Sequence, residues 1–125
     1  MYGDVGELLG KTCSDIIVSN DEIHFYVDDP EIAGRRQHYV LLHHQGCCEN
    51  VSIESIDGSI EDLIGVPLVM AEEISSVGHG PLSEYAESYT WTFYKFATQK
   101  GYVTVRWYGT SNGYYSESVS FMGPD

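Results

Sequence analysis

The chain has 125 residues, and its 19 acidic and 6 basic side chains give a formal net charge of −13. This balance argues against a protein that binds nucleic acid through the phosphates, because such binding needs clusters of Lys and Arg. The hydrophobic content of 42% is too high for a disordered chain. The length is that of one domain, so we expect a single domain over residues 1–125.

Strand patterns dominate the first half of the chain. Residues 22–27 alternate apolar and polar side chains, as a strand with one buried face does. Residues 37–43 are apolar on both faces, which predicts a central strand of a sheet. Turn-forming residues such as Pro30 and Gly58 interrupt the strand patterns. The predicted strands cover residues 12–18, 22–27, 37–43 and 51–56.

A short helical turn is predicted after the fourth strand. Ser59 can cap it, and Asp62 stands three residues later, as in a short capping box. Gly65 closes it after about one turn. Residues 66–75 follow as a strand, and residues 76–84, which contain two glycines and a proline, are predicted to form a mobile loop.

The last third of the chain has the clearest pattern. Residues 88–99, 102–108 and 114–122 are three successive predicted strands, joined by short connections that contain glycine. They predict a C-terminal three-stranded β-meander. The fold class is therefore mainly β, with roughly seven or eight antiparallel strands and one short helical turn in a single β-rich domain. The strands are expected to form one strongly curled sheet or two packed sheets.

Charge is distributed unevenly along this sequence. Residues 88–125 hold three basic and two acidic residues, whereas residues 1–87 hold three basic and 17 acidic residues, a net charge of −14. The C-terminal segment also contains both tryptophans and six of the ten tyrosines. The sequence thus predicts an acidic body beside a nearly neutral, aromatic sheet.

A dense group of polar side chains lies at residues 43–49, with the sequence HHQGCCE. His and Cys are the preferred zinc ligands. A turn at Gly46 could bring His44 and Cys47 together, with Cys13 or His24 supplied by a neighbouring strand. In the competing interpretation Cys47 fills space in the core and the histidines satisfy backbone groups at a strand end. Adjacent residues of a strand point to opposite faces, which favours this second interpretation.

The same group raises the possibility of nucleophilic catalysis by Cys47 or Cys48. A reactive thiol needs a lowered pKa, which His43 or His44 could provide. No nucleophile elbow or protease-like flanking sequence surrounds these cysteines. We therefore expect a protein that is not an enzyme and that needs no cofactor unless zinc binds.

Several segments resemble an uncharacterised family of small acidic proteins encoded by tailed bacteriophages. The resemblance rests on residues 43–51, 53–58 and 62–65, on Glu87–Lys95 and on Gly101–Ser118, and it covers most of the chain after residue 40. Members of that family often have an acidic residue where Gly46 stands, which weakens this position as a ligand. The resemblance implies a phage origin but no activity, although small phage proteins often bind host or defence proteins.

An exposed aromatic face is predicted on the meander. Strand alternation places Val103, Val105 and Trp107 on one side and their neighbours on the other. Tyrosine and arginine are favoured at protein interfaces. The predicted anchors are Tyr102, Arg106, Tyr108 and Tyr114. The acidic residues expected to steer a partner are Glu54, Asp57, Glu61, Asp62, Glu72 and Glu73.

These observations predict a non-enzymatic, phage-type acidic binding protein that engages or inhibits a basic host or defence protein, and that could mimic the charge of nucleic acid. The alternatives are a small zinc module centred on His43–Cys48 and a virion or assembly component. An exposed edge strand could also pair with a second copy of the chain. Neither a secretory signal nor a membrane span is recognisable, so we expect a cytoplasmic protein of the bacterial host with reduced thiols.

Overall fold

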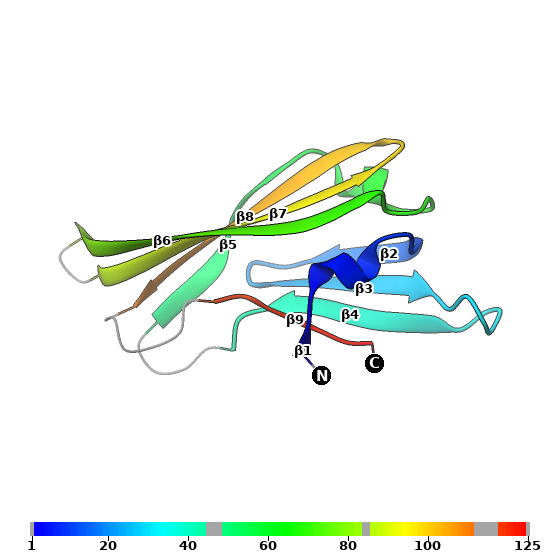
Figure 1. Ribbon diagram of the computed structural model, residues 1–125, viewed down its shortest axis with the longest axis horizontal. Helices are drawn as coiled ribbons and strands as arrows, with labels where there is room; N and C mark the ends of the chain where they lie inside the picture. The colour runs from blue at the N-terminus through cyan, green and yellow to red at the C-terminus, as the bar shows by residue number, and fades with distance from the viewer. Residues whose placement is uncertain (1, 45–48, 84–85, 112–117, 125) are drawn as a thin grey trace.

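The computed structural model describes residues 2–44, 49–83, 86–111 and 118–124. These residues form two antiparallel sheets that stack on each other (Figure 1). The five-stranded sheet has the order β1 (Tyr2–Gly3), β9 (Ser120–Met122), β4 (Arg36–Leu42), β3 (Glu22–Asp28) and β2 (Cys13–Val18). The four-stranded sheet has the order β5 (Glu49–Asp57), β8 (Gly101–Ser111), β7 (Ala86–Thr98) and β6 (Met70–Ser83). The predicted mainly-β class, with two packed sheets, is confirmed.

The core lies between the two sheets and follows from strand alternation. On β3 the residues Ile23, Phe25 and Val27 are buried, while the residues between them are half-buried on the outer face. On β8 the buried set is Val103, Val105 and Trp107, as predicted. Phe25 meets Phe96 of β7 with ring centroids 5.4 Å apart, which joins the sheets. Each such side chain stabilises the fold by roughly 1.5–3 kcal/mol.

The strand predicted to be central is central. β4 pairs with β3 on one side and β9 on the other. Its residues Tyr39 and Leu41 are buried against the core, and Val40 is half-buried on the outer face. The first and last strands, β1 and β9, pair with each other, so the two chain ends lie on the same side of the molecule (Figure 1).

The predicted C-terminal meander is wrong in its third strand. β7 and β8 form the expected hairpin, with Thr98 opposite Gly101. However, the edge of β8 that the third strand would occupy is taken by β5. Residues 120–122 instead cross to the other sheet as β9 and pair with β4. Consecutive strands do form a meander in each sheet, with β2, β3 and β4 in one and β6, β7 and β8 in the other.

The loop predicted at residues 76–84 is also wrong. β6 runs from Met70 to Ser83, and its pairing with β7 continues to His79 opposite Ser88. Glycine and proline weaken an inner strand, but β6 is at the edge of its sheet, where they are tolerated. The start of the predicted strand at Val66 is wrong as well, because Leu68 bonds instead to the loop before β2, with its N–H donating to the Lys11 carbonyl at 2.9 Å.

Two short 3₁₀ turns occur among the described residues. η2 (Ile60–Leu63) confirms the predicted helical turn, but the Ser59 side chain before it makes no capping hydrogen bond. η1 (Val5–Leu8) was not predicted. Asp4 caps it by accepting from the Gly6 N–H at 2.7 Å, and the Glu7 carboxylate accepts from the Asp4 N–H at 3.3 Å. The Asp-x-x-Glu spacing of this reciprocal cap is present in the sequence.

Candidate interaction surface

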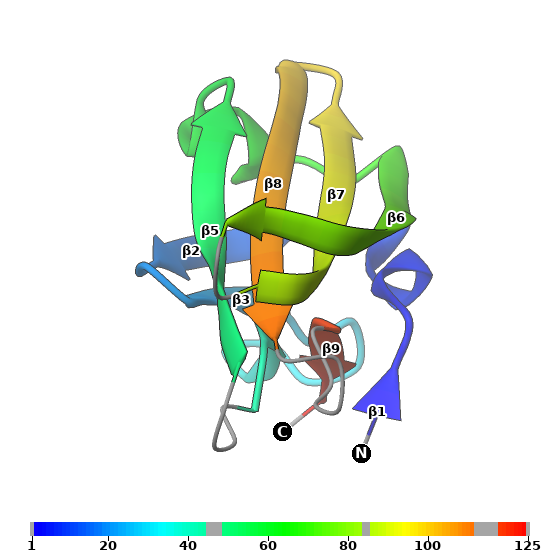
Figure 2. The ribbon, with the colours of Figure 1, turned by 90° about the vertical axis from the view of Figure 1, so that its left-hand side faces the viewer.

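The outer face of the four-stranded sheet collects most of the partly exposed aromatic side chains. Figure 2 shows β5, β8 and β7 side by side, and β6, the other neighbour of β7, crosses in front of β7 and β8 in this view. The register places Trp91 of β7 opposite Tyr108 of β8, and Phe93 opposite Arg106. All four are half-buried, because the alternate positions of both strands enter the core. We call this group, with Tyr102, the aromatic face.

Arg106 lies at the centre of the aromatic face. Its guanidinium carbon is 5.1 Å from the centroid of the Trp91 ring, a cation–π contact. Its Nη2 donates to the Glu54 carboxylate at 2.9 Å. Trp91 in turn packs on Tyr108 with ring centroids 4.3 Å apart and planes inclined by 43°. The four side chains therefore hold one another in place on an otherwise solvent-facing sheet.

A β-bulge places Glu54 beside Arg106. The register of β5 against β8 shifts between Ile53 and Ser55, so that Ile53 faces Trp107 and Ser55 faces Arg106. Glu54 is the extra residue between them. Bulges turn a side chain away from the regular alternation of a strand. Here the bulge leaves the carboxylate exposed and directed at the arginine.

Carboxylates border the aromatic face on both edge strands. Glu54 and Asp57 lie on β5, and Glu72 lies on β6 opposite Lys95. The aromatic residues lie on the two inner strands. Tyr102 is the most exposed of them, at 76%. This arrangement corrects the expectation of an acidic body beside a separate aromatic sheet. β5 and β6 belong to the acidic part of the sequence, yet they form the edges of the aromatic sheet.

Of the other predicted steering residues, one lies on β6 and two lie in η2. Glu73 lies opposite Tyr94. Burial raises the pKa of this carboxyl, while a hydrogen bond from Tyr94 lowers it and the nearby Asp4 charge raises it. Burial also raises the pKa of the Tyr94 hydroxyl, with the Glu73 charge as the second cause. Glu61 and Asp62 lie in η2, where their backbone carbonyls accept from the Lys100 and Thr98 side chains.

The sequence-based choice of anchors missed the residue that organises this face. Tyr102, Arg106 and Tyr108 are where they were predicted, on the outer face of β8. Tyr114 lies outside the described residues. Trp91 was overlooked, although residues 88–99 were predicted as a strand and alternation alone puts Trp91 and Phe93 on one side. The missing information was the register between β7 and β8, which places Trp91 opposite Tyr108.

The predicted zinc ligands are distributed over different parts of the structure. Cys13 is completely buried in the core, where burial, and secondarily the Asp28 charge, raise the pKa of its thiol to about 11. His24 lies on the outer face of the same sheet, away from the core. Its partner in the register of β2 and β3 is the exposed Ile17. The structure does not bring Cys13 and His24 together. Cys47 lies outside the described residues, and His44 is exposed.

His43 is buried, and both of its ring nitrogens are within hydrogen-bond distance of oxygen atoms. Nδ1 lies 2.7 Å from the Ser118 carbonyl oxygen, and Nε2 lies 3.2 Å from a Glu49 carboxylate oxygen. This matches the interpretation in which a histidine of the segment satisfies a backbone group. In the parts of the chain that the structure describes, no three or more His, Cys, Asp or Glu side chains form a group that could hold a metal ion.

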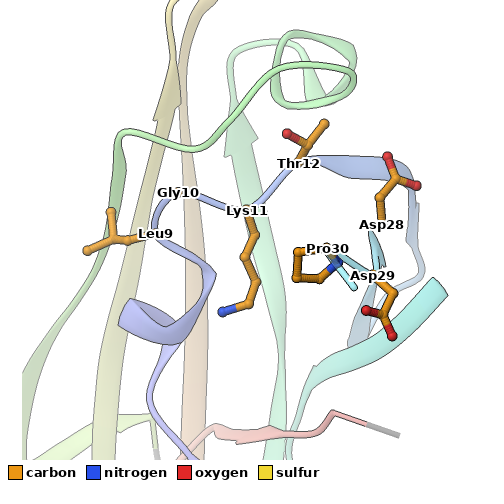
Figure 3. Close-up of a pocket in the computed structure, with 7 residues that line it drawn as sticks. All are labelled: Leu9, Gly10, Lys11, Thr12, Asp28, Asp29 and Pro30. Atoms are coloured by element: carbon orange, nitrogen blue, oxygen red, sulfur yellow. The ribbon is translucent and has the colours of Figure 1, made fainter. Parts of the chain in front are cut away.

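A pocket of about 410 Å³ opens beside the loop that precedes β2 (Figure 3). Two of its three charged side chains, Lys11 and Asp29, are held by loop contacts. The Lys11 amine turns away from the two aspartates and donates to the Glu7 carbonyl. Asp29 accepts from the Glu31 and Ile32 N–H groups and lies 3.7 Å from Arg35. The aromatic face, where several side chains contact one another, is the stronger candidate.

In the described residues no helix is long and apolar enough to cross a membrane.

Comparison with known proteins places the chain in a family. Neither a curated protein nor a solved structure matches the sequence. The sequence model of DUF7448, a domain of unknown function, matches residues 6–121. The chain therefore belongs to the DUF7448 family.

Proposed function

We propose that this protein is a non-enzymatic binding protein that uses the aromatic face to engage a basic protein partner. The resemblance to phage-encoded proteins suggests that the partner is a host or defence protein, which binding would inhibit. The observation that carries the proposal is the Trp91–Arg106–Tyr108 cluster, flanked by carboxylates on both edge strands.

The composition of this face matches that of a binding hot spot. Trp, Tyr and Arg are the residues that most often dominate binding energy, and they do so near the centre of an interface. Trp91, Arg106 and Tyr108 are held in fixed contact with one another. A rigid cluster loses little side-chain freedom on binding, so more of its contact energy is retained as affinity.

The hydrogen-bonding state of Arg106 also supports a binding role. Its Nε is shielded from solvent and has no hydrogen-bond partner among the described residues, although Nη2 is paired with Glu54. A shielded donor without an acceptor costs free energy. The side chain as a whole is 40% exposed, so a carbonyl or hydroxyl of a partner can approach its other guanidinium N–H groups, whereas Nε becomes reachable only if the side chain moves. The arginine would then add specificity to the contact.

The distribution of charge supports a basic protein as the partner. Glu54 and Asp57 on one side and Glu72 on the other border the aromatic face, and the whole chain carries −13. A partner with Lys and Arg around an apolar centre would complement this pattern and associate faster at low salt. Proteins that bind nucleic acid carry such basic surfaces, so mimicry of nucleic-acid charge is part of the proposal.

The test is capture of partners from a bacterial lysate on immobilised wild-type and variant proteins. Arg106→Ala and Trp91→Ala remove central contacts and are expected to weaken binding of the captured partner by roughly 30-fold, the equivalent of about 2 kcal/mol. Tyr26→Ala is the matched control, because Tyr26 is a half-buried aromatic residue on the outer face of the other sheet. It is expected to retain the partner.

Two further readouts decide the charge argument. Retention should fall as NaCl rises from 0.05 to 0.5 M, since screening weakens contacts between exposed charges. Excess duplex DNA should displace a partner whose basic surface normally binds nucleic acid. The proposal is wrong if every captured protein binds the Arg106 and Trp91 variants as well as it binds the wild type, or if retention does not depend on salt.

A further inference from the structure

A second group of polar side chains lies on the outer face of the five-stranded sheet, on the far side of the core from the aromatic face. The register places His24 of β3 opposite Val40 of β4, and Tyr26 opposite His38. His24 and His38 are thus diagonal neighbours on one face, a spacing that long side chains can bridge. His24 Nδ1 lies 2.7 Å from His38 Nε2, and His24 Nε2 lies 2.9 Å from the Glu22 carboxylate.

The two imidazole rings meet edge to edge. Their planes are parallel, and their centroids are 5.0 Å apart. Stacked faces could not bring two ring nitrogens within 2.7 Å, because this is less than the thickness of an aromatic ring. The centroid separation is accounted for by the nitrogen–nitrogen contact and the radii of two five-membered rings. The two nitrogens therefore point at each other along the line that joins the ring centres, as in an N–H···N hydrogen bond.

The carboxylate fixes the proton positions when both rings are neutral. Ionised Glu22 can only accept, so His24 carries its proton on Nε2 and presents a bare Nδ1. His38 then donates its Nε2 proton to that nitrogen. Moving this single proton to His38 Nδ1 would give two bare nitrogens that face each other, without loss of a proton from the protein.

We propose that His24 and His38 form a two-imidazole site for a divalent transition-metal cation of the zinc, nickel or copper type, with Glu22 as the outer partner of His24. Imidazole nitrogen is a preferred ligand of these ions. A carboxylate that accepts from the second ring nitrogen is the usual support of a metal-binding histidine. The remaining coordination positions would be filled by water or by a partner's side chain.

Metal binding requires the two nitrogens to separate and both rings to turn. Two Zn–N bonds of about 2.0–2.1 Å at a tetrahedral angle hold their nitrogens about 3.3–3.4 Å apart. The present separation of 2.7 Å must therefore widen by about 0.6 Å, with rotation of both rings. The His24 side chain is 28% exposed, so the metal can reach it from solvent. Tyr26 stacks on His38 at 4.9 Å, and Arg36 lies 5.1 Å above Tyr26, which limits how far His38 can turn.

The test is calorimetric titration of the reduced, full-length protein with zinc chloride at pH 7.5. The parent protein carries His44→Ala, Cys47→Ser and Cys48→Ser, which removes metal binding by those side chains. We expect one equivalent of zinc to bind. Either His24→Gln or His38→Gln should abolish binding, and Glu22→Ala should weaken it by about 10- to 100-fold. Glu31→Gln, which removes an exposed carboxylate from the β3–β4 loop, is the charge control and should leave it unchanged.

Ring-nitrogen NMR distinguishes ligation from a structural effect of the substitutions. Zinc should shift the signals of His24 Nδ1 and His38 Nε2, while His24 Nε2 keeps its proton. Unfolding midpoints of the variants show whether each one is folded. Absence of zinc binding by the folded parent, binding that survives loss of either histidine, or zinc shifts at other nitrogens would each overturn the proposal. The site is on the opposite sheet from the aromatic face, so its failure leaves the proposed function intact.

Discussion

Cys13 lies in the core with none of its surface exposed. Burial is the main cause that raises the pKa of its thiol to about 11 from 9.0, and the Asp28 charge adds to it. A reactive cysteine needs the opposite environment, one that lowers the pKa. The residue is thus chemically a small apolar side chain, and conversion to a nucleophile would require both exposure and a positive neighbour.

The thiol of Cys13 should resist alkylation in the folded protein. A pKa of about 11 instead of 9.0 makes the thiolate fraction at pH 8 about a hundredfold smaller, and burial blocks access as well. The thiolate forms only as pH rises towards the folded pKa, so the rate should climb steeply above pH 9. Iodoacetamide labelling with peptide mass spectrometry in buffer and in urea measures this. Labelling of Cys13 in buffer at the urea rate would contradict it.

Trp91 and Trp107 show why residue type alone does not assign a role. Both are tryptophans on neighbouring strands, but Trp107 is fully buried and Trp91 is half-buried beside Arg106. Alternation separates inward from outward positions within a strand. Whether an outward aromatic residue acquires a cationic neighbour depends on the register between strands, which is a tertiary property.

At the level of elements, the end of β5 depends on close approach of two backbones. Gly58 has φ +106°, and a Cβ added there would lie 2.2 Å from the Tyr102 carbonyl oxygen. This approach sets the position of β5 against the start of β8, and so the position of Tyr102 on the aromatic face. Gly34 has a similar φ of +82° but nothing within 4 Å of such a Cβ.

These two glycines form a matched pair for substitution by alanine. Gly34→Ala should lower the free energy of unfolding by about 1–2 kcal/mol, the cost of a left-handed backbone for a residue with a Cβ. Gly58→Ala should cost a further 1–3 kcal/mol or so, because the backbone contact cannot be relieved by a side-chain rotation. Urea unfolding of the two variants measures the difference. Equal midpoints would show that the two backbones separate without cost.

β6 illustrates a limit of reading elements from sequence. Two glycines and a proline within residues 76–84 have the composition of a loop. The structure continues the strand because β7 supplies a long partner and because, among the described residues, β6 has no second neighbouring strand that would need the missing donor. The choice between strand and loop was made by the partner strand and not by the segment itself.

On the scale of the whole molecule, excess negative charge opposes folding. The chain carries 19 acidic and 6 basic residues, and carboxylates lie on the edges of both sheets. Self-repulsion of this kind destabilises a compact state and is screened by salt. Exposed charges interact over about 30 Å at 0.01 M salt but only over about 3 Å at 1 M, where screening is strong.

The thermal midpoint should therefore rise with ionic strength. If screening contributes about 1 kcal/mol between 0.01 and 0.5 M NaCl, the midpoint should increase by roughly 3–5 °C. Thermal unfolding followed by circular dichroism measures it, and MgCl₂ at matched ionic strength tests for specific cation binding. A midpoint that is constant or falls as NaCl rises would mean that favourable ion pairs, such as Arg106–Glu54, outweigh the repulsion.

The sequence by itself determined the β class, most strand positions and the inward or outward direction of residues such as Val105 and Arg106, because side-chain alternation is a local property of a strand. It also indicated β4 as a central strand. Only the tertiary structure decided that β9 leaves β8 for the other sheet, that acidic β5 and β6 border the aromatic strands, and that His24 meets His38. These outcomes depend on which strand edges pair and in what register, and that choice is made by packing the whole core and not by any single segment.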